Sequence, residues 1–322
     1  MSTHLRRIIA LLSMFAASLA SAQGSYPDKP IRVIVGFPAG TTGDVIIRMM
    51  APKLGEGLGQ AIIVENRPGA GSSIAAEAVA RSRPDGYTLL LSTTANVINP
   101  SLYTNLSFDF SRDLIPVTLL AEAPALLVGH PSVAATSLAE LIALAKAKPD
   151  EMTYASSGNG TFTHLAGELF NQSAGVRLTH IPYKGSSQAL GDLLTGRVRL
   201  LFTPASTVLQ YVKAGTLKAF GTIGQQRLTG LPNTPLFSEA GIPGFDSALW
   251  FGLNAPAGTP PEVVERLAKE VGRVLARPEL KAQLAVQSIN TLPGGSAAFA
   301  ALMKKESTKW AGVIKNANIK PE

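Results

Sequence analysis

The chain has 322 residues, 46% of them hydrophobic, and it contains no cysteine. Disulfides, thiolate nucleophiles and cysteine–zinc sites are therefore excluded, and the hydrophobic content is that of a chain with full cores rather than a disordered one. Basic residues outnumber acidic ones by 29 to 22, but they are scattered and few aromatics stand among them. This mild positive charge favours small anions as ligands and argues against a nucleic-acid partner.

The first 22 residues are typical of a cleavable export signal. Arg6 and Arg7 precede an apolar run over residues 8–20, and Ala22 ends a small-x-small cleavage site. The apolar run is shorter than the roughly 20 residues that a membrane span needs. We therefore expect a soluble periplasmic protein that begins at Gln23. Arg6 and Arg7 leave with the signal and no acid does, so 27 bases and 22 acids remain, a net charge of +5.

Short β-rich apolar runs then alternate with helical patterns, which predicts parallel α/β units. The first part of the chain predicts strands at 31–36, 61–65 and 87–91, with helices at 43–58 and 72–81. A second cycle predicts strands at 125–128, 152–155, 179–182, 199–202 and 217–223. Its helices are expected at 137–148, capped by Thr136 or Ser137, and in segments ending near 173, 195 and 212.

The last part predicts a Gly/Pro/Thr-rich loop at 224–235, a strand at 249–253 and helices at 261–276, 278–286 and 296–315. Three final helices without a strand of their own are expected to pack on an existing sheet. We therefore predict two domains, one discontinuous (23–124 with 248–322) and one inserted (125–247). A cleft between two such domains is a favoured place for a ligand.

Four expected strand-to-helix loops are rich in glycine and hydroxyl residues: 37–44, 92–95, 156–161 and 183–187. Ligands of parallel sheets bind beyond the carboxyl ends of the strands, where helix N-termini present free N–H groups. Together these loops suit a carboxylate held by neutral donors, some through water. For any one loop, the alternative that these residues only form turns and helix caps stays open.

Several side chains near these loops have two interpretations. Asp44 could cap its helix or face a cationic group of a ligand, and Lys184 could pair with a second carboxylate or be solvated. His164 and Glu168 stand four residues apart, as in a helical metal site, but no second helical histidine accompanies them. His164 is therefore expected near the ligand or as a structural residue, and Phe37 in the cleft wall or the core.

Catalytic signatures are missing from the sequence. It contains no G-x-S-x-G elbow, no phosphate loop and no dinucleotide fingerprint. We expect a binding protein rather than an enzyme, with no cofactor and no metal. A ligand sensor of the same fold and an exported hydrolase are the alternatives.

Several motifs in fixed order carry a resemblance to a known family. They are the segment from Tyr26 to Gly40, followed by 64–71, 84–89, 154–158, 164–166, 182–185 and 256–260. The chain resembles the Bug (Bordetella uptake gene) family of extracytoplasmic solute-binding proteins, which serve tripartite tricarboxylate transporters. The resemblance implies a type II periplasmic-binding-protein fold that closes over a small organic carboxylate. It also implies the membrane subunits of such a transporter as partners, and we expect a monomer.

The resemblance also implies which residues bind the carboxylate. The matching positions are Ala39 and Gly40 in one domain, with Ser156, Ser157, Gly158 and Thr161 in the other. This chain departs from the family pattern at two places. Thr41 and Gly43 replace a glycine and a hydroxyl residue, so Thr41 or Thr42 is expected to supply donors instead. Arg199 and Thr203 stand where many members carry acids, which favours a non-aminated mono- or dicarboxylate.

The complete candidate site combines the loop residues with the neighbouring side chains. It contains Phe37, Ala39, Gly40, Thr41, Thr42, Asp44, Thr93, Thr94, Ser156, Ser157, Gly158, Thr161, His164, Lys184, Thr203 and Ala205.

Overall fold

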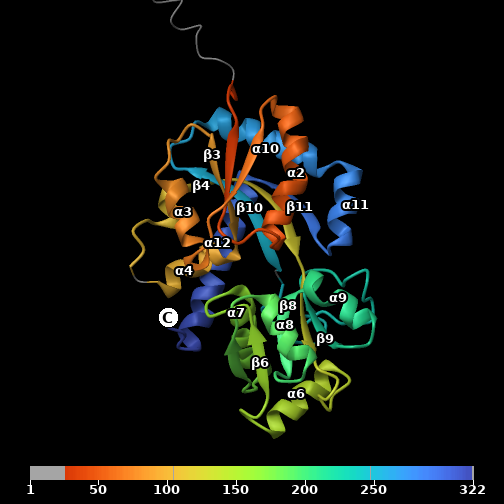
Figure 1. The fold of residues 1–322 in the computed structure, drawn as a ribbon. Coiled ribbons are helices and arrows are strands. Elements are labelled where there is room, and N and C mark those ends of the chain that lie inside the picture. The colour runs from red at the N-terminus through yellow and green to blue at the C-terminus, as the bar shows by residue number, and fades with distance from the viewer. Residues whose placement is uncertain (1–25, 104, 247, 321–322) are drawn as a thin grey trace, which may run out of the picture.

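The structure is a computed structural model that describes residues 26–103, 105–246 and 248–320. The predicted signal segment therefore lies outside the described residues. Two lobes, each built around one β-sheet, are stacked along the long axis of the molecule (Figure 1). We call them lobe 1, which holds the six-stranded sheet, and lobe 2, which holds the five-stranded sheet.

The sheet of lobe 1 is mixed. Its strand order is β11 (Asn290–Gly295), β4 (Leu114–Ala123), β10 (Leu249–Pro256), β3 (Thr88–Thr93), β1 (Ile31–Val35) and β2 (Ile62–Asn66). Strands β1, β2 and β3 are parallel, whereas β10 runs antiparallel to both β3 and β4. In β3, Leu89 and Leu91 belong to one buried cluster and Leu90 to another. Both faces of the sheet are therefore covered, which explains the nearly continuous apolar strands.

Helices cover each face of this sheet. One face packs against α2 (Thr42–Leu58), α10 (Pro261–Leu275) and α11 (Pro278–Val286). The other packs against α3 (Ser73–Ala80), α4 (Thr94–Leu102) and α12 (Ser296–Asn316), with the short segments η1 (Ala70–Ser72) and α5 (Phe110–Asp113) nearby.

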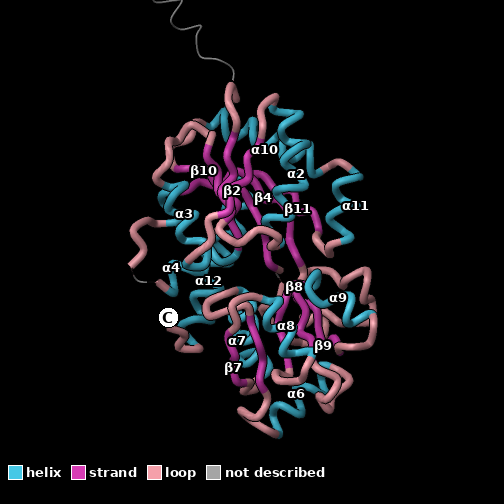
Figure 2. The backbone as a smooth tube through the Cα atoms, in the orientation of Figure 1, coloured by secondary structure: helices cyan, strands magenta, loops and turns pink. Residues whose placement is uncertain are grey.

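Lobe 2 repeats this plan on a smaller scale. Its strand order is β7 (Thr179–Pro182), β6 (Thr153–Ser156), β8 (Leu200–Pro204), β5 (Ala125–Gly129) and β9 (Lys218–Ile223). Helices α8 (Ser186–Leu194) and α9 (Ala205–Lys213) pack on one face, and α6 (Leu138–Ala147) and α7 (Phe162–Ala174) on the other. Figure 2 shows the strands of the two lobes as separate groups.

The lobes also touch each other away from the connecting segments. The C-terminal part of α12 packs against α7, where the rings of Phe162 and Trp310 meet edge to face with their centroids 5.7 Å apart. The Gln172 side-chain amide donates to the Val313 carbonyl at 3.3 Å. One buried apolar cluster consequently runs from lobe 1 through α12 into lobe 2.

The α/β prediction is confirmed, with three corrections. Strand β4 was not expected, because its sequence LIPVTLLAEA has no clear alternation and contains a proline. Strand β11 was also missed, since NTLPGG resembles a loop; its edge position tolerates the proline. The C-terminal tail therefore contributes a strand of its own. Both sheets are mixed rather than parallel, because the segments that pass between the lobes pair antiparallel to their neighbours.

Candidate functional site

The connection between the lobes brings the carboxyl ends of both sets of parallel strands to one place. In lobe 1, Thr93 at the end of β3 pairs with Phe251, and Ala123 at the end of β4 pairs with Leu249, so both strands end at the same edge. In lobe 2, Ala125 at the start of β5 pairs with Pro204 at the end of β8. Only residue 124 separates β4 from β5. The carboxyl edges of the two sheets therefore face each other, with the predicted loops on both sides.

Asp44 organises the loop after β1. Its carboxylate is almost fully buried and accepts hydrogen bonds from the Gly40 amide, the Arg48 Nε and the Asn66 side chain, each at 2.9 Å. Asn66 also donates to the Phe37 carbonyl at 3.0 Å. Burial alone would raise the pKa of Asp44, but these hydrogen bonds together lower it. Asp44 is thus an ionised structural anchor that holds the loop closed on the first turn of α2.

The outer part of this loop presents mainly backbone. Ala39 and Gly40 are exposed and Thr41 and Thr42 are half-buried, with Gly40 in the left-handed region at φ 80°. The Thr41 hydroxyl donates to the Pro38 carbonyl at 2.9 Å, and it does not cap α2, although Thr41 is the N-cap residue. The first amides of α2 thus donate no hydrogen bond to the N-cap side chain, which leaves a helix N-terminus suited to an anion.

The loop after β6 is built from hydroxyl groups. The Thr163 hydroxyl accepts from the Ser157 amide at 2.9 Å and lies 2.9 Å from the Ser157 hydroxyl and 3.1 Å from that of Thr161. Thr161 donates to the Gly158 carbonyl at 2.7 Å and is the N-cap residue of α7. Ser157, Gly158 and Thr161 are half-buried. The cluster thus offers neutral donors and acceptors at the beginning of a thirteen-residue helix.

Two stacked imidazoles support this loop from within lobe 2. The rings of His164 and His180 are nearly parallel, at 8°, with their centroids 3.8 Å apart. His180 Nε2 lies 2.7 Å from the buried Ser156 hydroxyl, and His164 Nδ1 accepts from the Gly160 amide at 3.0 Å. Burial lowers the pKa of His164 to about 4; burial and the neighbouring His164 lower that of His180 to about 3. Both rings are therefore neutral structural parts of the loop.

Three of the remaining predicted residues make hydrogen bonds within the protein. Thr93 caps α4 in a capping box with Asn96, and the buried Thr94 hydroxyl accepts from the Trp250 amide at 3.3 Å. Ala205 is buried and donates its amide to the Pro124 carbonyl at 2.8 Å.

Two more of the predicted residues differ in exposure. Lys184 is exposed, whereas Thr203 is buried with a hydroxyl that has no hydrogen-bond partner among the described residues.

Three residues that hold the site were not predicted. Asn66, Thr163 and His180 connect the two loops to their surroundings through side-chain hydrogen bonds. Asn66 and His180 lie on strands beside the loops they support, and Thr163 follows its loop. Their partners become neighbours only in the folded sheet. The sequence offered one signal for these three residues: each lies just inside a strand or helix next to a candidate loop.

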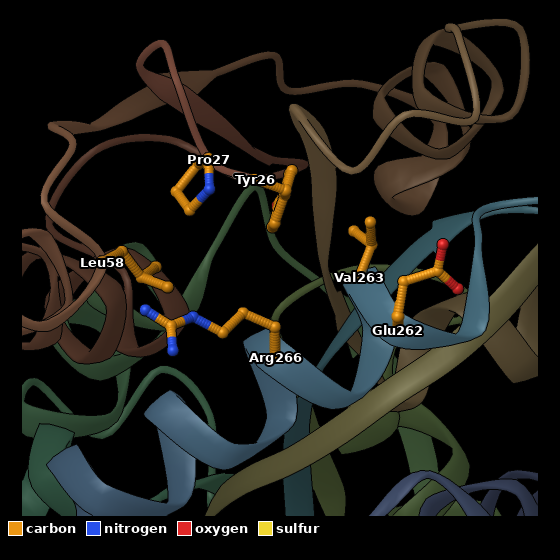
Figure 3. A pocket seen from close by; sticks show the side chains of 6 residues that line it. All are labelled: Tyr26, Pro27, Leu58, Glu262, Val263 and Arg266. Carbon is orange, nitrogen blue, oxygen red and sulfur yellow. The ribbon is translucent and has the colours of Figure 1, made fainter. Parts of the chain in front are cut away.

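A separate cavity of about 410 Å³ lies at the other edge of lobe 1. Tyr26 and Pro27, just before β1, line it together with Leu58, Glu262, Val263 and Arg266. In Figure 3, Arg266 extends toward Leu58 whereas Glu262 points to the opposite side. Because this cavity lies at the amino end of β1, it is remote from the facing carboxyl edges. Among the described residues, no group of three or more His, Asp or Glu side chains could hold a metal ion.

Comparison with known proteins identifies the family. The family model described as tripartite tricarboxylate transporter family receptor matches residues 46–319. The chain belongs to this receptor family. The resemblance to Bug proteins is thereby confirmed, because protein BugT of Bordetella pertussis is 34% identical over 98% of this chain and 99% of its own length. Members of this receptor family bind solutes rather than transform them, so the prediction of a non-enzyme is confirmed as well.

Solved structures support the same family fold. A protein of R. palustris, solved with adipate, is 33% identical, covers 92% of this chain and 100% of its own, and superimposes with a TM-score of 0.82. MatC from Rhodopseudomonas palustris, solved with bound malate, is 29% identical over 90% of this chain and 100% of its own, with a TM-score of 0.78. The type II periplasmic-binding-protein fold is thus confirmed. Within the described residues, no helix has the length and hydrophobicity to cross a membrane.

Proposed function

We propose that this receptor captures a small carboxylate in the periplasm, after removal of residues 1–22, and delivers it to the membrane subunits of a tripartite tricarboxylate transporter. The observation that carries the proposal is the opposition of two loops at the facing carboxyl edges. One leads into the first turn of α2, which the N-cap side chain leaves open, and the other contains the hydroxyl cluster around Thr163. Both offer neutral donors to a carboxylate.

The favoured ligand is a non-aminated mono- or dicarboxylate. The two structural neighbours described above hold adipate and malate, which are both dicarboxylates without an amino group. The acidic side chain of the first loop, Asp44, is already engaged by Arg48 and Asn66, so it does not offer a free carboxylate to a ligand ammonium group. The neutral Thr203 fits the same preference.

Binding is coupled to closure of two domains, residues 23–124 with 248–322 and residues 125–247. Residue 124, between β4 and β5, and the end of the segment that leads into β10 connect the two domains and would act as the hinge. A ligand that contacts both loops favours the closed state by its differential affinity for that state. We expect the receptor to act as a monomer.

The test is a thermal-shift screen of the mature protein with organic acids and amino acids, followed by calorimetry. We expect adipate, malate or a related acid to bind, and aspartate and glutamate to bind far more weakly. Replacing Ser157 with Ala should weaken binding, because it removes a hydroxyl from the cluster. The control Ser137→Ala removes the N-cap bond of α6, remote from both loops, and should lower stability only. Tight binding of aspartate without any dicarboxylate would contradict the proposal.

A further inference from the structure

The loop between β2 and α3 adopts a backbone conformation that is unusual for residues with side chains. Three consecutive residues are left-handed, with φ values of 44° at Ala70, 58° at Gly71 and 77° at Ser72. Only the central one is a glycine, so Ala70 and Ser72 adopt this conformation at an energetic cost. Such conformations persist only where surrounding contacts determine them.

Two asparagines of α4 supply these contacts. Asn99 Nδ2 donates to the Gly71 carbonyl and to the Ser73 hydroxyl, both at 2.8 Å, and lies 3.3 Å from the Ala70 carbonyl. Asn96 Nδ2 donates to the Ser72 hydroxyl at 3.3 Å. Both asparagines are almost fully buried, and a spacing of three residues places them on the same face of the helix.

The same contacts connect all three carboxyl-end loops of lobe 1. Asn96 Oδ1 accepts from the amide of Thr93, at the end of β3. Ser72 lies so close to Gly36 that a Cβ on this glycine would be 1.9 Å from the Ser72 hydroxyl. Gly36 is the residue that leads from β1 into the 37–44 loop. A displacement of Ser72 would therefore act directly on the base of that loop.

We propose that Asn96 and Asn99 are positioning residues for ligand binding. By holding Ser72 in its left-handed conformation against Gly36, they set the orientation in which the 37–44 loop presents its amides. This inference rests on the proposed function, in which those amides face the ligand carboxylate. The asparagines themselves do not touch the ligand.

The test compares two identical substitutions in the mature protein. Asn99→Asp replaces the donating amide with an acceptor that cannot bond the Gly71 carbonyl. The control is Asn171→Asp in α7, where Asn171 makes two hydrogen bonds to the backbone of Leu178, at 3.2 Å and 3.0 Å. Asn171 lies nine residues after Phe162, the first residue of α7. It is therefore roughly 14 Å along the helix from the end that carries the hydroxyl cluster. Hydrogen exchange of the unliganded protein and calorimetry with adipate and malate are measured for both.

We expect Asn99→Asp to accelerate exchange in residues 67–73 and also in 37–44, and to weaken binding about tenfold, which corresponds in size to one buried hydrogen bond. Asn171→Asp should change neither. Equal losses of affinity in both variants, or faster exchange confined to 67–73 with unchanged affinity, would overturn the inference. If Asn99→Asp does not fold, Ser72→Ala removes the hydroxyl that lies against Gly36 and should show the same two effects.

The ligand screen of the wild-type protein tests the proposed function separately from the inference about Asn96 and Asn99. If the wild-type protein binds neither adipate nor malate, nor any other acid in the screen, the proposed ligand class is wrong. The exchange measurement still decides the inference in that case. Protection of 37–44 that depends on Asn99 and not on Asn171 supports it, and unchanged protection refutes it.

Discussion

Acidification should destabilise lobe 2 through its stacked histidines. Protonating either ring would place a positive charge in a buried position, and protonating both would place two charges in rings 3.8 Å apart. The pKa is lowered from 6.5 to about 4 for His164 and to about 3 for His180. In the unfolded chain both rings take up protons near their ordinary pKa. Between pH 6.5 and 4 the unfolded state therefore binds more protons, and stability is lost as the pH falls.

The size of this effect follows from the shifts. Each histidine contributes a loss of about 1.4 kcal/mol per pH unit in that window, hence about 2 kcal/mol between pH 6.5 and 5. The loss from His164, which is almost fully buried, should approach this value. For His180, which is half-buried and partly screened by solvent, the same value is an upper limit. The full contribution is present above pH 6.5. Because Ser156 contacts His180, ligand affinity should fall over the same range.

Urea unfolding at pH 7, 6 and 5 would measure the slope directly. His164→Gln should be less stable than the wild type at pH 7 but should lose less stability on acidification. The matched control His130→Gln removes a partly exposed histidine of the same lobe that bonds Ser132, and it shows what the loss of a histidine outside the stack does to stability. If wild type and His164→Gln lose equal stability between pH 7 and 5, the neutral buried stack does not explain the acid response.

Three further substitutions test individual contacts. Asp44→Asn should lower the free energy of unfolding by about 2 kcal/mol in urea titrations, because it weakens charge-assisted bonds, including that from Arg48, and calorimetry should show weaker ligand binding. Gly158→Ala should cost about 1–3 kcal/mol in the same titration, since φ is 130° and a Cβ would lie 3.1 Å from the Tyr183 carbonyl; a neutral result would contradict the conformational argument. Thr203→Val should leave the melting temperature unchanged or raise it, because the buried hydroxyl has no partner to lose among the described residues.

Much of the fold could be predicted because local signals and tertiary structure agree in the parallel units. Strand β7 and helix α11 have the predicted bounds, and Ser137, one of the two predicted caps, caps α6. The failures lie where tertiary pairing decides the conformation. Strand β4 is stabilised by β10 and β11 on its two sides, and neither partner is near it in sequence. Local periodicity therefore contains little information about it.

The candidate site could be predicted as loops but not as contacts. Glycine and hydroxyl residues after strands indicated the two opposing loops. The same residue types did not distinguish exposed donors from internal anchors: the half-buried Thr161 lies beside Thr163, whereas Thr94 is buried against Trp250. Asp44 shows the same limit. Whether Asp44 is a structural residue or faces a ligand depends on its hydrogen bonds with Arg48 and Asn66. The bond from Asn66 forms only because β2 lies beside β1 in the folded sheet.

Under the proposed function, the electrostatic arrangement would let the site hold an acid and still release it. Asp44 is ionised but paired, and His164 and His180 are neutral, so neither loop offers an unpaired buried charge at these positions. Attraction for the proposed carboxylate would then come mainly from the helix N-termini of α2 and α7, each equivalent to about half a positive charge. Release to a transporter would break hydrogen bonds to neutral groups rather than a buried ion pair, and it would leave no uncompensated charge behind. Protonation of the histidine stack would add charge but displace the loop that supplies the donors, so affinity should fall at acidic pH despite the added attraction.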